Sequence, residues 1–312
     1  MLKLLTDLSD RASLGAFKTA STLFNLLPVA DAHKLGHQLV RLWLTCDRRH
    51  RQIIEKNLEI ALQLKPASPE SLQLQDEIAQ QLGYNLCELL LLQNPAYRRL
   101  LQQNLEVSGL EHLDLIQAEK SGAILVSAHY GNWELSGFFS KVIMKPIAGV
   151  AKPIKNKPRL YAAIKKTREE MGFTLLDKKG SAGALVRRLR KGGIIAMLID
   201  QRARKRYRIW APFFGHQVAT IPSPAVLGRL SGCPVIPIFS TRIRPLHHQF
   251  TIKEPIFIPK TGDSREIVDE YTERLNHIIE EQIRSDPAQW FWPHDRWRKI
   301  KPPDSNLLTP IK

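Results

Sequence analysis

The chain has 312 residues, 43% of them hydrophobic, and is therefore long enough to bury one substantial core with a helical extension packed on it. Its 46 lysines and arginines exceed its 30 aspartates and glutamates, and the net charge of +16 predicts an anionic partner: a bilayer, a nucleic acid, or an acidic protein or phosphorylated substrate. The three cysteines, Cys46, Cys87 and Cys233, are far apart and form no CxxC pair, which excludes a cysteine-based zinc site and a disulfide framework and favours a reducing compartment.

Charged residues recur early in the chain, at Lys3, Asp7, Asp10 and Arg11. A cleavable signal peptide needs an uninterrupted apolar segment, so secretion is not expected. The most apolar stretch that follows, 19–30, has roughly a dozen residues, against the ~20 needed to cross the hydrocarbon of a bilayer. Peripheral attachment to a membrane surface remains open.

Residues 34–62 show apolar positions at intervals of three and four, which predicts one amphipathic helix. Basic residues lie between the apolar positions. This pattern is equally typical of a helix that packs on a core with a solvated face and of one that contacts a membrane. After a proline-containing break, a second helix is expected over 69–92.

The character of the sequence changes at Gly122, where buried strands begin to alternate with helices. Strands are expected at 123–128, 147–151, 173–176, 194–199, 234–239 and 249–258. Helices are expected at 132–143, 158–172, 181–191 and 222–232, bounded by proline or glycine signals. This alternation predicts an α/β fold with a central, mostly parallel sheet flanked by helices. Because ligands of such sheets bind at the carboxyl ends of the strands, motifs at those ends carry the most functional weight.

The motif HYGNWE (129–134) lies where the strand 123–128 passes into its helix. At this spacing we expect Glu134 to approach His129, hold the imidazole and stabilise its protonated form. His129 is then a suitable general base, which an alcohol needs to attack a thioester because its own pKa is far too high. Gly131 lets the backbone pass close to a substrate, and amides near Asn132 at the helix start are placed to receive a phosphate or an oxyanion. The alternative, a capping asparagine beside a structural histidine, is the commoner origin of an isolated spacing of this kind.

HYGNWE resembles the H-x4-D/E box of the lysophospholipid acyltransferase superfamily, in the form found in the lipid A late acyltransferases, the lauroyl and myristoyl transferases. Further segments are similar to that family in the same order: RRHRQIIEKNLEIAL (48–62), RLRKGGIIAMLIDQ (188–201), APFFGHQVATIPSPAVLGRLSGCPVIPIF (211–239) and WFWPHDRWRK (290–299). The resemblance covers almost the whole chain. It implies a glycerolipid acyltransferase-like fold.

The resemblance also implies that His129 and Glu134 are the catalytic pair and that Arg168 helps to bind a phosphorylated acceptor. The alternative for Arg168 is a surface arginine paired with an acidic side chain. Asp200 and Gln201 follow the strand 194–199 and are expected on the same rim of the sheet as His129, unless they only cap a turn.

Three further features have two interpretations each. Lys152 follows the strand 147–151 and is a candidate contact for an acceptor phosphate, although a single lysine is usually only solvated. The basic segment RARKRYR (202–208) fits a phosphate or membrane contact as well as a solvated loop. The aromatic residues Trp290, Trp292 and Trp297 fit an interfacial patch, but a core-packed segment accounts for them somewhat better.

The resemblance implies an acyltransferase that moves a fatty acyl chain from a thioester, carried by acyl carrier protein or coenzyme A, to a hydroxyl of a lipid A precursor or related glycolipid. It would act at an anionic membrane surface, the cytoplasmic face of the bacterial inner membrane, as a peripheral or monotopic protein. A lysophospholipid or another glycolipid is the nearest alternative acceptor. Neither a metal nor another cofactor is expected, since the thioester is a co-substrate. We divide the chain into an N-terminal helical, membrane-associating extension (1–112), an α/β acyltransferase domain (113–300) and a C-terminal tail (301–312).

Other functional classes have less support. A serine hydrolase would carry a G-x-S-x-G elbow, which Ser127, Ser136 and Ser223 lack, and the His–Glu spacing is not that of an H-E-x-x-H zinc hydrolase. A nucleic-acid-binding protein would account for the charge and for the segment 202–208, but it leaves HYGNWE unexplained, so no nucleic-acid partner is expected.

Overall fold

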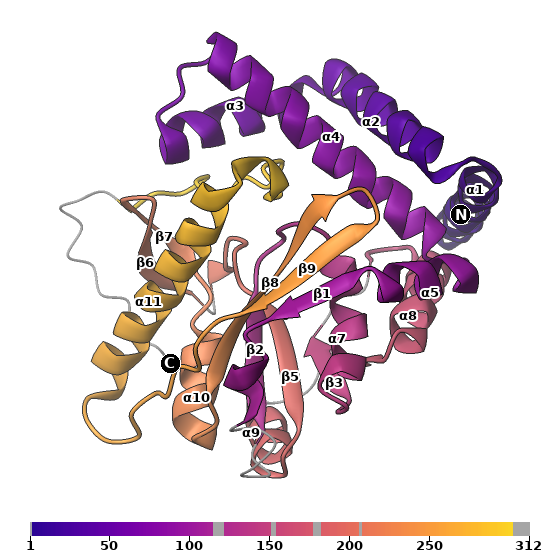
Figure 1. Ribbon diagram of the computed structural model, residues 1–312. Coiled ribbons are helices and arrows are strands. Elements are labelled where there is room, and N and C mark those ends of the chain that lie inside the picture. Colours follow the sequence, from indigo (N-terminus) through magenta and orange to yellow (C-terminus); the bar gives the residue numbers. More distant parts are fainter. Residues whose placement is uncertain (1, 115–121, 151–153, 177–181, 206–207, 302–312) are drawn as a thin grey trace.

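The computed structural model describes residues 2–114, 122–150, 154–176, 182–205 and 208–301 (Figure 1). Five helices come first: α1 (Leu2–Leu26), α2 (Val29–Cys46), α3 (Arg48–Leu62), α4 (Pro69–Leu91) and α5 (Pro95–Gln103). The start of α4 follows the rule for a helix beginning, because the Ser68 hydroxyl accepts the amide of Ser71 and a proline occupies the first turn.

The single helix predicted over 34–62 is wrong: the chain breaks at Asp47 between α2 and α3. The Asp47 carboxylate accepts the backbone amide of His50 and lies 2.6 Å from its Nδ1, so it caps the start of a new helix. The apolar period continues across the break, which is why the pattern alone suggested one helix. Helix α2 then packs closely on α4, since Gly36 and Gly83 face each other where a Cβ on either would meet backbone atoms.

Seven strands form the main sheet in the order β1-β9-β8-β2-β5-β3-β4. Their bounds are β1 (Leu105–Ser108), β2 (Ala123–Ser127), β3 (Ile147–Val150), β4 (Phe173–Leu176), β5 (Ile194–Leu198), β8 (Val235–Arg244) and β9 (His247–Ile252). Among these seven described strands only the β8–β9 pair is antiparallel, so the predicted mostly parallel α/β fold is confirmed. The first strand, β1, belongs to the sheet although it precedes residue 113, at which the α/β domain was expected to begin.

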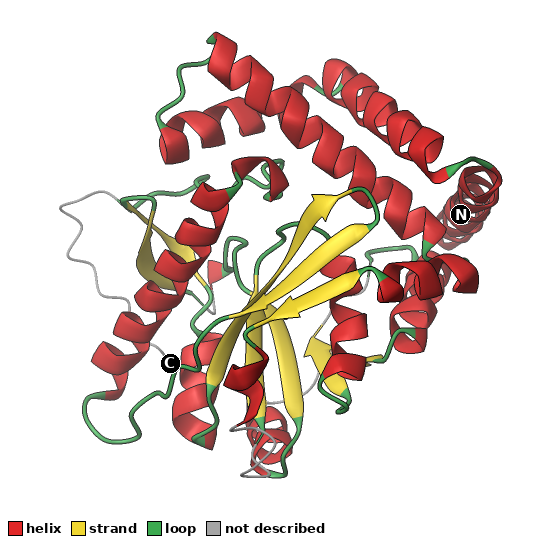
Figure 2. Cartoon of the chain, viewed as in Figure 1, coloured by secondary structure: helices red, strands yellow, loops and turns green. Residues whose placement is uncertain are grey.

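Helices cover both faces of this sheet (Figures 1 and 2). On one side lie α9 (Ala182–Arg190), α10 (Ser223–Ser231) and α11 (Ser264–Ser285); on the other lie α7 (Ser136–Val142), which follows the short 3-10 helix η2 (Trp133–Leu135), and α8 (Pro158–Glu170). Strand β2 is buried on both faces: Ile124 and Val126 belong to one apolar cluster, and Ala123 and Leu125 belong to the other. Helix α4 passes over the end of the sheet toward which β8 points (Figure 1).

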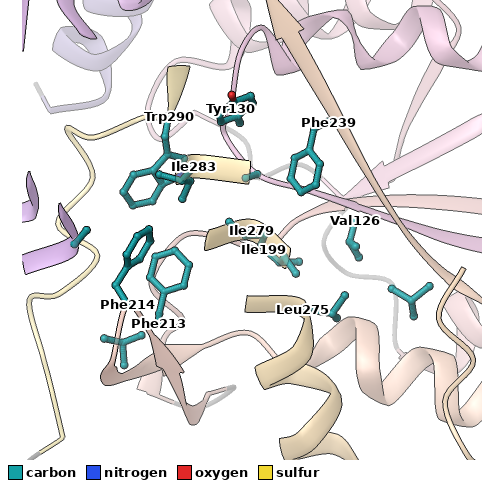
Figure 3. Packing of buried hydrophobic residues seen from close by; sticks show 14 of the residues in the cluster. Val126, Tyr130, Ile199, Phe213, Phe214, Phe239, Leu275, Ile279, Ile283 and Trp290 are labelled. Atoms are coloured by element: carbon teal, nitrogen blue, oxygen red, sulfur yellow. The ribbon is translucent and has the colours of Figure 1, made fainter. Parts of the chain in front are cut away.

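A small hairpin and the C-terminal segment close one side of the core. The hairpin joins β6 (Ile209–Phe213) to β7 (His216–Thr220), and after α11 a 3-10 helix, η4 (Pro287–Gln289), leads into the aromatic segment. Trp290, Trp292 and Trp297 are each at most 1% exposed, and Trp290 lies near Phe213 within the buried cluster of Figure 3. The core-packed interpretation of these tryptophans is therefore confirmed, and the interfacial one is wrong.

Most predicted strand positions agree with the structure to within two residues, but two strands differ. Strand β8 runs five residues past the predicted end at 239, because it continues as the first arm of a hairpin with β9. Strand β9 starts at His247 and ends at Ile252, after which only an isolated bridge, Val235 to Ile256, continues the pairing. In the part of the chain that is described, no helix combines the length and apolarity that crossing a bilayer requires.

Candidate active site

Two neighbouring strands bring the site together. Strands β2 and β5 are parallel, and Ser127 at the end of one is in register with Leu198 at the end of the other. His129 and Asp200 each follow two residues later, so both lie at the carboxyl edge of the sheet. This confirms the expectation that Asp200 and His129 share one rim.

His129 is held by Asp200. Its Nδ1 lies 2.8 Å from Asp200 Oδ1, and the other carboxylate oxygen accepts the indole N–H of Trp290 at 2.9 Å. Burial alone would raise the pKa of Asp200, but the contacts with His129 and Trp290 lower the pKa below its ordinary value, so the carboxylate is charged. A charged carboxylate at Nδ1 requires a proton there, which leaves Nε2 as the basic nitrogen. The imidazole packs against the rings of Trp133 and Phe291, which also contact each other.

The expectation that Glu134 holds the imidazole is wrong. Its two carboxylate oxygens accept hydrogen bonds from Arg168, at 2.8 Å from Nε and 2.6 Å from Nη2. Burial alone would lower the pKa of Arg168, and the paired carboxylate raises it above its ordinary value. The spacing does bring His129 and Glu134 to one cavity. It does not reveal that Arg168 of α8 forms a bidentate pair with Glu134. Arg168 is thus paired with an acidic side chain, as its alternative interpretation had it, but it lines the cavity.

The loop between His129 and Glu134 is fixed by its own hydrogen bonds. Gly131 has a φ of +54° and lies against the carbonyl oxygen of Ser240, where a Cβ would come within 1.7 Å. Its amide donates to the carbonyl of Gln289 at 2.9 Å. Asn132 is buried, and its side chain accepts the amide of Glu134 at 3.1 Å, so it caps η2. The amides of Glu134 and Leu135 at the start of η2 both donate to Asn132, so these two amides are not free to receive an anion, contrary to the expectation for the helix start.

A cavity of about 450 Å³ opens beside the imidazole. Its polar lining includes His129, Glu134, Arg168 and Gln201. Its apolar lining comes from the sheet face and from α7: Leu125, Phe139, Ile147, Phe173, Leu175, Ala196, Met197, Leu198, Ile238 and Phe250. From β5 the cavity is lined by Ala196, Met197 and Leu198, and from β3 by Ile147, which is in register with Ile194 at the start of β5, so the cavity extends inward from the carboxyl edge of the sheet.

The remaining predicted site residues fall in different places. Gln201 lines the cavity, with its Nε2 3.4 Å from His129 Nε2. The backbone amide of Arg202 donates to His294 Nε2 at 3.0 Å, which ties the start of the basic segment to the C-terminal segment. Arg204 and Lys205 are exposed. Residues 206 and 207 of that segment, and Lys152, lie outside the described residues.

Three contributors to the site were not identified from the sequence as such: Trp290, Phe291 and His294. All three belong to WFWPHDRWRK, and the amide of Phe291 also donates to the carbonyl of His129 at 2.9 Å. The only signal in the sequence was the density of aromatic and basic residues in that segment. Its contact with the motif at 129–134, far earlier in the chain, depends on the tertiary structure.

The geometry and the comparisons with known proteins point the same way. The family model described as bacterial lipid A biosynthesis acyltransferase matches residues 12–299. This chain belongs to that family. The matched range includes His129, Glu134, Arg168, Asp200 and the C-terminal aromatic segment.

Several proteins named as acyltransferases are similar in sequence. The lipid A biosynthesis lauroyltransferase of Escherichia coli (strain K12) is 27% identical over 276 residues, which cover 87% of each chain. The lipid A biosynthesis palmitoleoyltransferase of the same strain is 26% identical over 203 residues, 64% of each chain. The phosphatidylinositol mannoside acyltransferase of Mycobacterium tuberculosis (strain CDC 1551 / Oshkosh) is 26% identical over 201 residues, 61% of this chain and 59% of that one.

Proposed function

We propose that this acyltransferase moves a fatty acyl chain from a thioester donor to a hydroxyl of a lipid A precursor or a related glycolipid. The observation that carries the proposal is the Asp200-held imidazole of His129 at the mouth of a cavity with an apolar lining. A base and an apolar chamber in contact are what acyl transfer from a lipid donor to an alcohol requires.

In the proposed reaction, Nε2 of His129 takes the proton of the acceptor hydroxyl as its oxygen attacks the thioester carbonyl. Asp200, already ionised, stabilises the imidazolium that forms. The tetrahedral intermediate then collapses, the C–S bond breaks, and the proton on the imidazole passes to the departing thiolate. The side-chain amide of Gln201, close to Nε2, supplies a neutral donor for the developing oxyanion. The thioester supplies the acyl group, and this chemistry calls for no metal or other cofactor.

Arg168 and Glu134 serve the acceptor in this proposal. A guanidinium can donate two parallel hydrogen bonds, and this bidentate geometry suits a phosphate as well as a carboxylate. Glu134 holds the guanidinium toward the cavity when no phosphate is present. The phosphate of an acceptor would then compete with Glu134 or share Arg168 with it, which places the acceptor hydroxyl on the His129 side of the cavity.

The apolar lining accommodates the acyl chain. Its side chains come from the sheet face and α7, and burying a methylene contributes roughly 0.8 kcal/mol. A chain that enters along β5 leaves its thioester at the carboxyl edge, beside His129. The carrier, acyl carrier protein or coenzyme A, stays outside the cavity.

The N-terminal helices provide a surface for peripheral attachment to an anionic bilayer, which we propose to be the cytoplasmic face of the inner membrane. Leu23 and Leu26 on α1 and Leu39, Leu42 and Trp43 on α2 are exposed, and Leu26 and Leu42 reach 75% and 60%. Exposed basic residues, including Lys18 and Arg41, lie on the same two helices. Apolar side chains with neighbouring cations are the combination that binds an anionic membrane interface.

The acceptor is the least constrained part of the proposal. Two of the similar enzymes are named for lipid A and one for phosphatidylinositol mannoside, so both glycolipids are candidates. Mass spectrometry of lipids from cells with and without the gene tests this directly, because a difference of one acyl chain identifies acceptor and chain together. The His129→Ala variant is the control and should give the profile of cells without the protein. An unchanged lipid profile, together with no transfer from acyl carrier protein or coenzyme A thioesters in vitro, would overturn the proposal.

A further inference from the structure

A buried charged cluster, none of whose residues lines the cavity, lies beside the loop 129–134, which we call the catalytic loop. Its centre is Glu88 of α4, which is 0% exposed. The Glu88 carboxylate accepts hydrogen bonds from Arg242 of β8, 2.7 Å from Nη2, and its other oxygen lies 3.2 Å from Nε2 of His248 on β9. Burial alone would raise the pKa of Glu88, but Arg242 and His248 lower the pKa well below its ordinary value. Glu88 is therefore an anion inside the protein.

This cluster reaches the catalytic loop by two routes. The Asn132 side-chain amide donates to Glu88 Oε2 at 2.5 Å, and the same side chain caps the turn that carries Glu134. Asn85, one turn earlier on α4, donates to the carbonyl of Gly131 at 2.7 Å and accepts from Arg242 at 2.7 Å. Every polar atom of the Asn132 side chain is thus engaged either by Glu88 or by Glu134.

Arg242 connects the cluster to the C-terminal segment as well. Its backbone N–H donates to the side chain of Gln289 at 2.8 Å, and the Gln289 amide returns a bond to the Arg242 carbonyl at 3.0 Å. The Gln289 carbonyl in turn accepts the amide of Gly131. Helix α4 and Gln289 therefore bond directly to residues 131 and 132, and Arg242 of β8 bonds to the groups of α4 and to Gln289 that do so.

We infer that Glu88 is a positioning residue for the catalytic loop, acting through Asn132 to hold in place the backbone that connects the base His129 to Glu134 at the cavity. A packing role alone would not explain why a carboxylate is used, since an apolar side chain fills such a position at lower cost in desolvation. An anion provides a short, directional acceptor for the Asn132 amide that a neutral side chain cannot match. This inference rests on the proposed function, because positioning matters only if the loop takes part in acyl transfer.

The test uses the full-length Glu88→Gln variant, which keeps the shape of the side chain and removes its charge. We expect kcat to fall about 10- to 100-fold, because small displacements of a catalytic group have effects of that order, while the KM for the acyl donor changes less than about two-fold. Asn132→Ala should lower kcat similarly. The double variant Glu88→Gln/Asn132→Ala should be no slower than Asn132→Ala alone, since both substitutions break the same Glu88–Asn132 contact. The matched control is Asn276→Ala, which removes a buried asparagine that binds the carbonyl of Pro212, away from the loop. It should lower the unfolding temperature with kcat within about two-fold.

A second readout does not depend on activity. Hydrogen exchange of the peptide that spans 129–135 should become faster in Glu88→Gln and stay unchanged in Asn276→Ala, because the Glu134 amide is protected by the Asn132 side chain. If Glu88→Gln leaves Arg242 unpaired and fails to fold, the Glu88→Gln/Arg242→Met variant removes both charges, and it should fold with the same low kcat and fast exchange. Normal kcat and exchange in a folded Glu88 variant, or independent effects in the double variant with Asn132, would overturn the inference. A wild-type protein without acyl transfer would instead overturn the proposed function, and the exchange result would still decide whether Glu88 orders the loop.

Discussion

The Nδ1 atom of His129 lies 2.8 Å from the Asp200 carboxylate, across the ends of two adjacent parallel strands. The H-x4-E spacing draws attention to Glu134 as the partner of the imidazole, yet Glu134 is held by Arg168. The site therefore contains two separate pairs at one cavity: a histidine with its orienting aspartate, and an arginine with its glutamate. Substitutions in the two pairs should therefore change different kinetic constants.

Replacing Asp200 with Asn should lower kcat by on the order of 10²- to 10⁴-fold without loss of the fold, because an amide neither fixes the proton on Nδ1 nor stabilises the imidazolium. Glu134→Gln should have a smaller effect on kcat. Steady-state kinetics with both substrates varied, together with thermal unfolding, measures this. If Asp200→Asn were fully active and Glu134→Gln inactive, the carboxylate that assists His129 would be Glu134 after all.

Arg168→Ala should raise the KM for a phosphorylated acceptor about ten-fold or more and change the KM for the thioester donor little, since a charged hydrogen bond is typically worth about 1.5–3 kcal/mol. Arg168→Lys should raise the acceptor KM less than Arg168→Ala does but still above the wild-type value, because lysine keeps the charge and cannot donate two parallel hydrogen bonds. Lys166→Ala is the matched control, a cation on the same helix that is 79% exposed and pairs with Glu170. Equal acceptor KM in the Arg168 variant and the parent would rule out phosphate binding there.

Enlarging Ala196 should shorten the preferred acyl chain. This residue of β5 lines the cavity, so Ala196→Leu places added methyl groups in the space proposed for the chain. We expect kcat/KM for the longest donor accepted by the wild type to fall at least about ten-fold, while a donor several carbons shorter is used almost normally; roughly 1–3 kcal/mol is the usual effect of a methylene on pocket selectivity. A set of donors of graded length provides the measurement and its own control. A uniform loss across all lengths would point to a general packing defect.

The double variant Leu26→Glu/Leu42→Glu should bind anionic liposomes at least about ten-fold more weakly, because it removes two exposed apolar side chains and adds two charges of the same sign as the lipid. Vesicle sedimentation at fixed salt measures the partitioning. Leu230→Glu is the control, since that leucine is 49% exposed on α10. Equal weakening by the control would mean that charge alone, and not the α1–α2 surface, determines binding.

Stability should depend on His294 as the pH falls. Burial, the largest cause, lowers the pKa of His294 to about 4, while the unfolded chain has the ordinary value of 6.5. Between these two pKa values the unfolded state binds a proton on this histidine that the folded state does not. The stability contributed by the neutral His294 is therefore complete above pH 6.5 and is lost as the pH falls toward 4. The integrated loss is at most about 3 kcal/mol. Denaturant unfolding from pH 7 to pH 4 should show a shallower decline for His294→Gln, whose side-chain oxygen can accept the Arg202 amide in place of Nε2. Parallel declines in variant and parent would contradict the role of His294.

Much of the architecture follows from local sequence patterns. The strand 173–176 and the helix that begins at Pro158 occupy their predicted positions, because apolar periodicity, a proline and a glycine act over a few residues. The placement of His129 at a strand end follows from the same local signals. The break at Asp47 is a local feature too, but the unbroken apolar period concealed it.

The pairings within the site depend on the tertiary structure. Asp200 meets His129 because β5 lies beside β2, and the order of strands in a sheet has no local signature in the chain. Arg168 reaches Glu134 from α8, and Glu88 reaches Asn132 from a helix more than 40 residues earlier. A sequence therefore determines which side chains are available near a strand end. Their partners are decided when distant segments pack together, because hydrogen bonds between side chains depend on ångström-scale placement that no residue spacing specifies.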